Sequence, residues 1–236
     1  MNEFNLKEII LYEDEHLIAL NKPAGLLSIE DGYDLIKLNL RSILRDIYGA
    51  IWAVHRLDKY TSGVIVFAKN QNSHRKLNNS FSSHEIIKNY RGIINGVPIW
   101  NSYEIALSLK INGDKKHRTV IDITNGKPAL TFINTLSNQG IYSYADIFPR
   151  TGLTHQIRAH LSAIGFPILG DDLYWRCCKL KKNQSLIHHQ DNEGYFLHAY
   201  SLKFAHPISN VPMIITAPLP ISFTHMLSIL KLNLKC

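Results

Sequence analysis

The stretch AVHRLDKYTSGVIVFAK, residues 53–69, places a polar cluster directly before a strongly apolar run. Residues 63–69 read as a β-strand, because Val, Ile and Phe follow a glycine there. If residues 54–58 are extended, the side chains of Arg56 and Asp58 lie on the same face. The two are either a surface ion pair worth about 0–1 kcal/mol or a reactive carboxylate held among cations. The stretch by itself leaves both interpretations open.

Similar strand patterns recur along the chain. They are rich in Ile, Val, Tyr, Phe and Thr, and Gly, Asn, Asp and Pro separate them. The expected strands are residues 8–12, 16–20, 63–69, 90–96, 103–111, 129–136, 141–148, 196–204 and 213–218.

Apolar residues recur at helical spacing in three segments, 35–49, 154–165 and 221–232. We expect the second helix to begin with Thr154 as its N-cap and to end at Gly165. Strands outnumber helices without regular alternation, which predicts an α+β fold with a large mixed, mainly antiparallel sheet flanked by helices. No internal repeat or Gly/Ser/Pro-rich linker is evident, so residues 1–236 are expected to form one catalytic domain.

The composition limits the classes of protein to consider. With 236 residues, 45% of them hydrophobic, the chain can bury a sizeable core, and a net charge of +7 favours a polyanionic partner such as nucleic acid. Cys177, Cys178 and Cys236 provide neither a disulfide framework nor a C-x-x-C zinc spacing, which indicates a reducing compartment. Because the sequence lacks a signal core and any run of about 18 apolar residues, we expect a soluble cytoplasmic protein that does not contact a membrane.

The segment 176–190, RCCKLKKNQSLIHHQ, is basic, with four Lys or Arg residues, two histidines and no acid. Two interpretations are open: a solvated loop or part of a basic surface that holds phosphates.

Several chemistries lack their motifs in this sequence. The dinucleotide-binding, P-loop and α/β-hydrolase signatures do not occur. His155 and His160 lie five residues apart on the expected helix, whereas the H-E-x-x-H zinc motif needs a spacing of four. We therefore expect no metal ion and no cofactor.

Three stretches combine charged and aromatic residues in a way that could support catalysis. The first is HRLDKYTSG, residues 55–63, and the second, residues 88–96, sets Tyr90 between the cations Lys88 and Arg91 on a strand. In the third, residues 150–161, Arg158 borders the apolar stripe of a helix, so its guanidinium can be held at a buried margin.

Together these stretches resemble the RluA-type pseudouridine synthases, which convert uridine in RNA to pseudouridine. Five motifs agree in order along the chain, and the second and fourth are long and specific. They are NKPAGLLS (21–28), HRLDKYTSGVIVFAKN (55–70), KNYRGIING (88–96), THQIRAHLSAIGFPILGDDLY (154–174) and LHAYSLKFAHP (197–207).

The chain departs from the family pattern at four positions. Leu153 lies where the family usually has arginine, and Gly92 and Ile94 replace an alanine and a valine. Trp175 follows the L-G-D-x-x-Y element where glycine is usual. The S4-type RNA-binding domain that precedes the catalytic domain in many relatives is also expected to be missing.

The resemblance implies a role for each catalytic residue. Asp58 would be the essential carboxylate, which either attacks the sugar covalently or removes a sugar proton to form a glycal. Arg158 would be its ion-pair partner, and Arg56 would fill the stack when the uridine flips out. Tyr90 would stack on the base and take the carbon 5 proton.

The resemblance also implies residues that bind the substrate: His55, Arg56, Thr61, Lys88, Thr154, His155 and Gln156. The reaction changes no oxidation state, so neither a redox cofactor nor a metal is required. The expected partner is a tRNA or rRNA stem-loop, with transfer RNA slightly favoured, and the enzyme is expected to be a monomer.

Two alternatives from other classes were weighed against this interpretation. An RNA-binding protein or RNA chaperone could keep the fold without catalysis, although Asp58, Tyr90 and Arg158 are all present. A glycosidase usually needs a second, paired carboxylate, and no motif supplies one.

Overall fold

The computed structural model describes residues 5–30, 38–175 and 194–232. The chain divides into two compact units, which are described separately. Unit 1 consists of Met1–Lys88 and Ala199–Leu219, and unit 2 of Asn89–His198 and Pro220–Cys236. That both units act as a single catalytic domain stays a prediction.

Unit 1 is built on a group of β-strands. They are β1 (Ile10–Glu13), β2 (Leu17–Lys22), β3 (Trp52–Ala53), β4 (Ser62–Ala68), β11 (Leu197–Ala205, in unit 1 from Ala199) and β12 (Pro212–Thr216). The strand order is β1-β2-β4-β11, with β3 paired to β4 and β12 paired to β11. The pairs β1/β2, β2/β4, β3/β4 and β11/β12 are antiparallel. Every residue of β4 is buried, which explains its unbroken apolar sequence.

The turn into β4 depends on a glycine. Gly63 has a φ of +110°, and a Cβ atom there would collide with the backbone carbonyl of Ala199 in β11. Only glycine allows the two strands to approach this closely.

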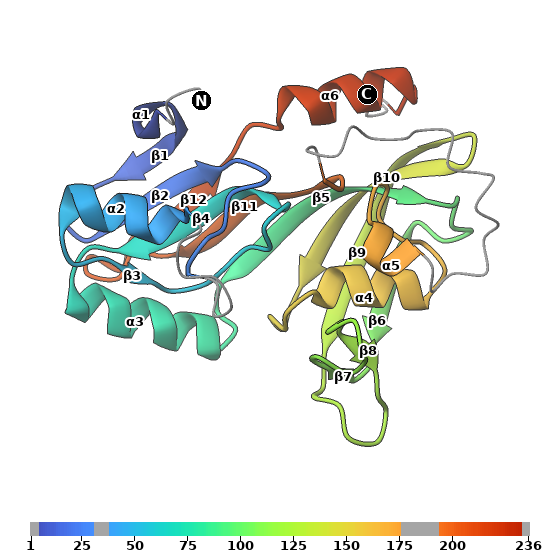
Figure 1. Ribbon diagram of the computed structural model, residues 1–236, viewed down its shortest axis with the longest axis horizontal. Helices are drawn as coiled ribbons and strands as arrows, with labels where there is room; N and C mark the ends of the chain where they lie inside the picture. The colour runs from blue at the N-terminus through green and yellow to red at the C-terminus, as the bar shows by residue number, and fades with distance from the viewer. Residues whose placement is uncertain (1–4, 31–37, 176–193, 233–236) are drawn as a thin grey trace. The chain divides into compact units, whose positions relative to one another are not determined.

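The helices of unit 1 are α1 (Leu6–Ile9), α2 (Leu40–Tyr48) and α3 (Gln71–Ser82). Asn39 caps α2 by accepting a hydrogen bond from the backbone N–H of Ser42 at 2.9 Å, and Asn70 caps α3 through Ser73 at the same distance. In Figure 1, α3 runs beside the strands of unit 1. The sequence did not predict α3, because only Ser73 and Leu77 of this polar helix are buried.

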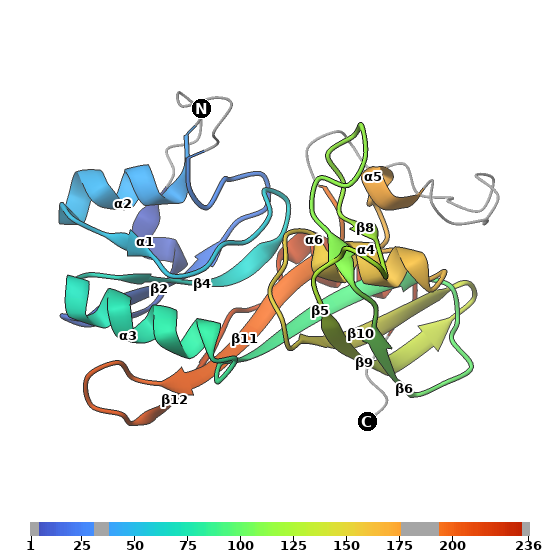
Figure 2. The same ribbon diagram turned by 90° about the horizontal axis from the view of Figure 1, so that it is seen from below.

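Unit 2 contains a second group of antiparallel strands in the order β5-β10-β9-β6. Their bounds are β5 (Ile87–Asn95, in unit 2 from Asn89), β6 (Ser102–Ala106), β9 (Leu130–Gln139) and β10 (Tyr142–Pro149). The short pair β7 (Leu109–Lys110) and β8 (Val120–Ile121) forms a separate arm (Figure 2). The expected strand 103–111 thus divides into β6 and β7, because Leu107 and Ser108 bond instead to His160 and Asp122.

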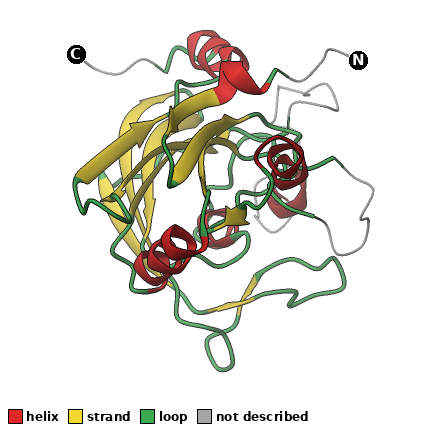
Figure 3. Cartoon of the chain, turned by 90° about the vertical axis from the view of Figure 1, so that its left-hand side faces the viewer, coloured by secondary structure: helices red, strands yellow, loops and turns green. Residues whose placement is uncertain are grey.

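The helices of unit 2 are α4 (Gln156–Ala163), α5 (Asp172–Trp175) and α6 (Ile221–Ile229). The predicted helices 154–165 and 221–232 are confirmed with shorter bounds, whereas α5 has only four residues and no helical pattern to reveal it. Figure 3 distinguishes the helices, drawn in red, from the strands, drawn in yellow.

The predicted α+β class, with a large mixed sheet flanked by helices, is confirmed. No helix within the described ranges is long and apolar enough to cross a membrane. The basic segment 176–190 and all three cysteines lie outside the described residues.

Candidate active site

The ten predicted site residues fall into two groups. Unit 1 contains His55, Arg56, Asp58, Thr61 and Lys88, and unit 2 contains Tyr90, Thr154, His155, Gln156 and Arg158.

Asp58 lies on an irregular segment directly before β4. The segment 54–58 is not a strand, so the premise that its side chains alternate as in a strand is wrong. Arg56 is exposed, Leu57 is buried and Asp58 is half-buried. The backbone turns sharply after Asp58, because its carbonyl accepts a hydrogen bond from the N–H of Thr61 at 3.1 Å. The exposed side chain of Arg56 is accessible to a partner.

His55 takes part in the framework of unit 1. Its Nε2 atom accepts a hydrogen bond from the backbone N–H of Val66 at 3.0 Å, and its ring stacks on Phe81 with centroids 4.7 Å apart. Burial lowers the pKa of His55 to about 3, and the charge of Lys88 adds to this effect. The imidazole is therefore neutral and aimed at the backbone.

Lys88 is half-buried and Thr61 is buried. Burial lowers the pKa of Lys88 to about 8. Thr61 is 2% exposed, so the protein covers most of its surface.

Tyr90 lies on β5, where its backbone pairs with Ile147 of β10, and its side chain is half-buried. The next residue, Arg91, forms an ion pair with Asp146 at 3.0 Å. A Cβ atom at Gly92 would lie 2.9 Å from the Cδ1 atom of Ile147, so the isoleucine side chain takes the space that the family's usual alanine would need.

Helix α4 begins differently from the prediction. Thr154 is not its N-cap: that position belongs to His155, whose φ of +56° is left-handed and whose side chain makes no capping bond. The backbone carbonyl of Thr154 instead accepts a hydrogen bond from the hydroxyl of Thr119 at 2.7 Å. The hydroxyl of Tyr174 accepts the N–H of Thr119 at 2.9 Å and lies 3.1 Å from Nδ1 of His155.

Gln156 is 3% exposed, and protein groups occupy both ends of its amide. Oε1 accepts hydrogen bonds from the Thr151 hydroxyl at 2.7 Å and the Leu153 N–H at 3.1 Å. Nε2 donates to the carbonyl of Leu130 and the hydroxyl of Thr131, both at 3.0 Å. These bonds join the start of α4 to β9.

Arg158 is buried, as predicted, with 6% of its surface exposed. Nε and Nη2 of its guanidinium donate to the carboxylate of Asp171 at 2.6 and 2.9 Å, a bidentate pair. The guanidinium carbon also lies 4.9 Å from the ring centroid of Tyr174 and 4.3 Å from that of Tyr195. The ion pair and the two rings fix the direction of the arginine.

The sequence did not single out Asp171 or Lys22. Asp171 occurs in the L-G-D-x-x-Y element, 13 residues after its partner, so only the fold reveals the pair. Lys22 ends β2 and is fully buried. Burial lowers its pKa to about 7, against the opposing effect of the Asp58 charge, so Lys22 lies within the electrostatic reach of that carboxylate.

The packing of Leu153 explains one family departure, whereas at Trp175 the structure shows only a backbone contact. Leu153 packs against a small cluster formed by Leu109, Ala129, Ala159 and Tyr174. Trp175 ends α5, and its N–H donates to the carbonyl of Asp171 at 2.9 Å.

The described residues contain no group of three His, Cys, Asp or Glu side chains that could hold a metal ion. His160 is fully buried, and its ring nitrogens lie 2.9 Å from the hydroxyl of Thr131 and 2.9 Å from the carbonyl of Leu107. Both nitrogens therefore bond within the protein.

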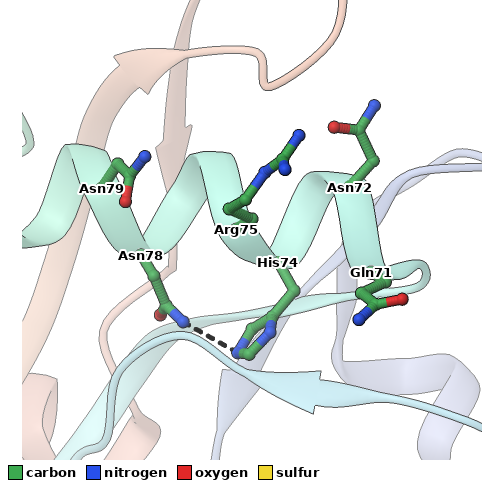
Figure 4. Close-up of a pocket in the computed structure, with 6 residues that line it drawn as sticks. All are labelled: Gln71, Asn72, His74, Arg75, Asn78 and Asn79. Atoms are coloured by element: carbon green, nitrogen blue, oxygen red, sulfur yellow. Dashed lines mark hydrogen bonds between the residues drawn. The ribbon is translucent and has the colours of Figure 1, made fainter.

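A polar pocket lies on α3 of unit 1 (Figure 4). Its lining residues are Gln71, Asn72, His74, Arg75, Asn78 and Asn79. Nδ2 of Asn78 donates to Nε2 of His74 at 2.9 Å. The lining includes no carboxylate and none of the predicted site residues, so we base the candidate site on the motifs and not on this pocket.

Comparison with known proteins identifies a family for the sequence. Residues 16–163 match the RNA pseudouridylate synthase family. The chain is 36% identical over 229 residues to ribosomal large subunit pseudouridine synthase C of Rickettsia typhi, an alignment that covers 94% of this chain and 72% of that protein. It is 32% identical over 210 residues to the dual-specificity RNA pseudouridine synthase RluA of Pasteurella multocida, covering 89% and 92%.

A solved structure supports the same fold. The protein titled human RNA pseudouridylate synthase domain containing 4 matches with a TM-score of 0.78 and 26% identity, over 97% of this chain and 95% of that one.

Proposed function

The chain belongs to the RNA pseudouridylate synthase family, and from this premise we propose that Asp58 is the carboxylate with which it converts uridine to pseudouridine. The observation that carries the proposal is the signature HRLDKYTSGVIVFAKN at 55–70, which lies wholly inside the matched residues 16–163. The half-buried position of Asp58, between exposed Arg56 and buried Thr61, is consistent with a carboxylate that meets a substrate.

The proposed chemistry needs an ionised, directed carboxylate. Asp58 either attacks the sugar or removes a sugar proton, so that the bond from uracil nitrogen 1 to the sugar breaks and the base can turn. Carbon 5 then joins the sugar as the bond to Asp58 breaks or as Asp58 returns the sugar proton, and carbon 5 loses its own proton. Two further roles belong to the proposal: Arg158, whose guanidinium is held by Asp171, also acts as a cationic partner of Asp58, and Tyr90 stacks on the base and accepts the carbon 5 proton.

Exposed Arg56 is the proposed residue that enters the RNA stack when the uridine flips out. Its planar guanidinium can stack on bases, and flipping costs a few kcal/mol. Lys88 is proposed to bind the substrate as a cation. Burial lowers its pKa only to about 8, so its ammonium group stays mostly protonated at neutral pH.

For the other five predicted substrate-binding residues we propose a positioning role in place of direct contact with RNA. His55, Thr61, His155 and Gln156 are held by hydrogen bonds or rings within their own units. Thr154 uses its backbone carbonyl in the same way. We therefore propose that these five residues position the site and that Arg56 and Lys88 contact RNA.

Large-subunit ribosomal RNA is the proposed first substrate to test. Three of the most similar relatives are named ribosomal large subunit pseudouridine synthase C, at 36% identity. The dual-specificity relative at 32% identity makes a second RNA class worth including, and transfer RNA stem-loops supply it. A cytoplasmic location and a monomeric state are parts of the same proposal.

The decisive experiment measures pseudouridine formed in ribosomal RNA transcripts and in transfer RNA by wild type and by Asp58→Asn. This substitution keeps the size of the side chain but removes its charge, so turnover should vanish while the Kd for RNA stays within about three-fold. Asp46→Asn, at an exposed position on α2, is the matched control and should be fully active. Near-wild-type turnover by Asp58→Asn would show that another group carries the reaction.

A further inference from the structure

The segment 22–28 holds the main chain on both sides of Asp58. On the N-terminal side, the buried hydroxyl of Ser28 bonds twice to Leu57. It donates to the carbonyl of Leu57 at 2.8 Å and accepts the N–H of Leu57 at 3.0 Å. A single side chain therefore satisfies both backbone polar groups of the residue before Asp58.

On the C-terminal side, the carbonyl of Lys59 receives two donors from the same segment. The N–H of Gly25 lies 2.9 Å from it and the Nζ atom of Lys22 lies 3.0 Å from it. Nζ also donates to the carbonyls of Pro23 at 2.9 Å and Leu26 at 2.8 Å. All three ammonium protons are thereby used.

Burying a lysine ammonium here costs free energy, and only polar contacts that an apolar side chain could not make can offset that cost. Lys22 is 0% exposed, and burial disfavours its charged form. The charge of Asp58 and the three carbonyl acceptors oppose this cost. Replacing Lys22 by an apolar residue would remove the burial cost but leave three carbonyls without this donor and Asp58 without this cation.

We propose that Lys22 and Ser28 are positioning residues for Asp58, which they hold by fixing the peptide units of Leu57 and Lys59. The inference rests on the proposed catalytic role of Asp58. Its physical basis is that catalysis depends on near-attack geometry, where a displacement of about 1 Å can cost about 10²-fold in rate.

Two variants test the proposal. Ser28→Ala removes both bonds to Leu57 with little change in volume, and Lys22→Met removes the ammonium but keeps the length of the chain. Single-turnover rates with pre-bound RNA should fall roughly 10- to 100-fold for each variant. The Kd for RNA should stay within about three-fold, because neither side chain is exposed to bind it.

Matched controls separate positioning from loss of stability. Ser73→Ala changes a fully buried serine whose hydroxyl has no hydrogen-bond partner in the described chain. Lys69→Met changes a lysine at the other end of β4, where it pairs with Glu13. Leu77→Ala, in the core of unit 1, supplies a destabilised variant that leaves the segment 22–28 intact.

The proposal predicts a rate loss in Ser28→Ala and Lys22→Met, and wild-type rates in all three controls when measured well below their Tm. A wild-type rate for Ser28→Ala would overturn it, as would an equal rate loss in Leu77→Ala at the same fall in Tm. If Lys22→Met does not fold, Ser28→Ala alone decides. Failure of the proposed role of Asp58 looks different: Asp58→Asn would then keep near-wild-type turnover, whatever the rates of Ser28→Ala and Lys22→Met.

Discussion

The Asp58 segment in unit 1 and the Arg158 helix in unit 2 fix a charged side chain by different means. Around Asp58 the protein holds the backbone, through Ser28 on one side and Lys22 on the other. Around Arg158 it holds the side chain itself, through a bidentate carboxylate, Asp171, and two tyrosine rings.

This difference indicates how each region should fail. A backbone-held carboxylate can be misaligned without loss of the fold, because its neighbours move while the core of β4 stays packed. A buried guanidinium that loses its bidentate carboxylate destabilises the fold, because a buried charge is then less well compensated. Changes near Asp58 should therefore reduce the rate first, and changes near Arg158 should reduce stability as well.

The largest expected effect after the loss of Asp58 itself concerns Tyr90 of unit 2. Tyr90→Phe keeps the aromatic face that stacks on a base but removes the hydroxyl, and general-base catalysis typically contributes 10²–10⁴-fold. We expect a rate loss of about that size with unchanged RNA affinity, and a loss of affinity as well for Tyr90→Ala. Label release from RNA tritiated at carbon 5 is the measurement. A wild-type rate of release from Tyr90→Phe would limit Tyr90 to stacking.

The next effect is on the stability of the Arg158 helix. Asp171→Ala removes the bidentate carboxylate partner of the buried Arg158 guanidinium, so the free energy of unfolding should fall by about 3–5 kcal/mol. Arg158→Ala should lose a similar amount, together with activity. Denaturant unfolding measures both.

An exposed pair provides the control for this prediction. Arg45 lies 4.0 Å from Glu30 with 59% of its side chain exposed, so Arg45→Ala should change stability by about 0–1 kcal/mol. If Asp171→Ala is equally mild, the buried pair does not hold the helix and the contrast between the two regions fails.

The contrast also explains which parts of the structure the sequence could predict. Strand β4 was predictable because it is buried on both faces and its apolar run is unbroken. The burial of Arg158 was predictable from the apolar stripe it borders. Helix α3 was not, because its stability rests on the Asn70 cap and a narrow buried face.

The partners of the site residues were harder to predict than the residues themselves. Asp171 and Lys22 belong to quoted motifs, but pairing Asp171 with Arg158 requires the turn through Gly165 and Gly170. Lys22 resembles an exposed strand-end cation in sequence, and only its three carbonyl contacts reveal its burial. The motifs were sufficient to predict the reactive side chains. The residues that orient them are brought together by long-range contacts, which only the structure reveals.

A smaller effect is expected from pH in the Asp58 region. The folded pKa of His55 is about 3, below the ordinary value of about 6.5 that it regains on unfolding. Between these values the unfolded state binds a proton that the fold does not, so stability should fall as pH drops from about 6.5 toward 3. The slope for one proton is about 1.4 kcal/mol per pH unit.

His55→Gln tests this slope, because its amide oxygen can still accept the N–H of Val66 but does not titrate. The unfolding free energy of the variant should depend less on pH between 6 and 4 than that of wild type, on the scale given above. His225→Gln, at an exposed position on α6, is the control. Parallel pH profiles for wild type and His55→Gln would rule out His55 as the source of acid sensitivity.

The smallest effect is expected at Leu153, beside the Arg158 helix, where the family usually has arginine. Leu153 is half-buried against Leu109 and Tyr174, so Leu153→Ala should lose only about 1 kcal/mol of stability. In Leu153→Arg the aliphatic stem can keep part of that packing while the guanidinium reaches solvent. If the family's arginine binds a phosphate, this variant should bind RNA more tightly at low salt. The slope of log Kd against log salt should then steepen by the amount expected for one additional phosphate contact. Unchanged salt dependence would show that the family's arginine has a structural role here, which Leu153 replaces by packing.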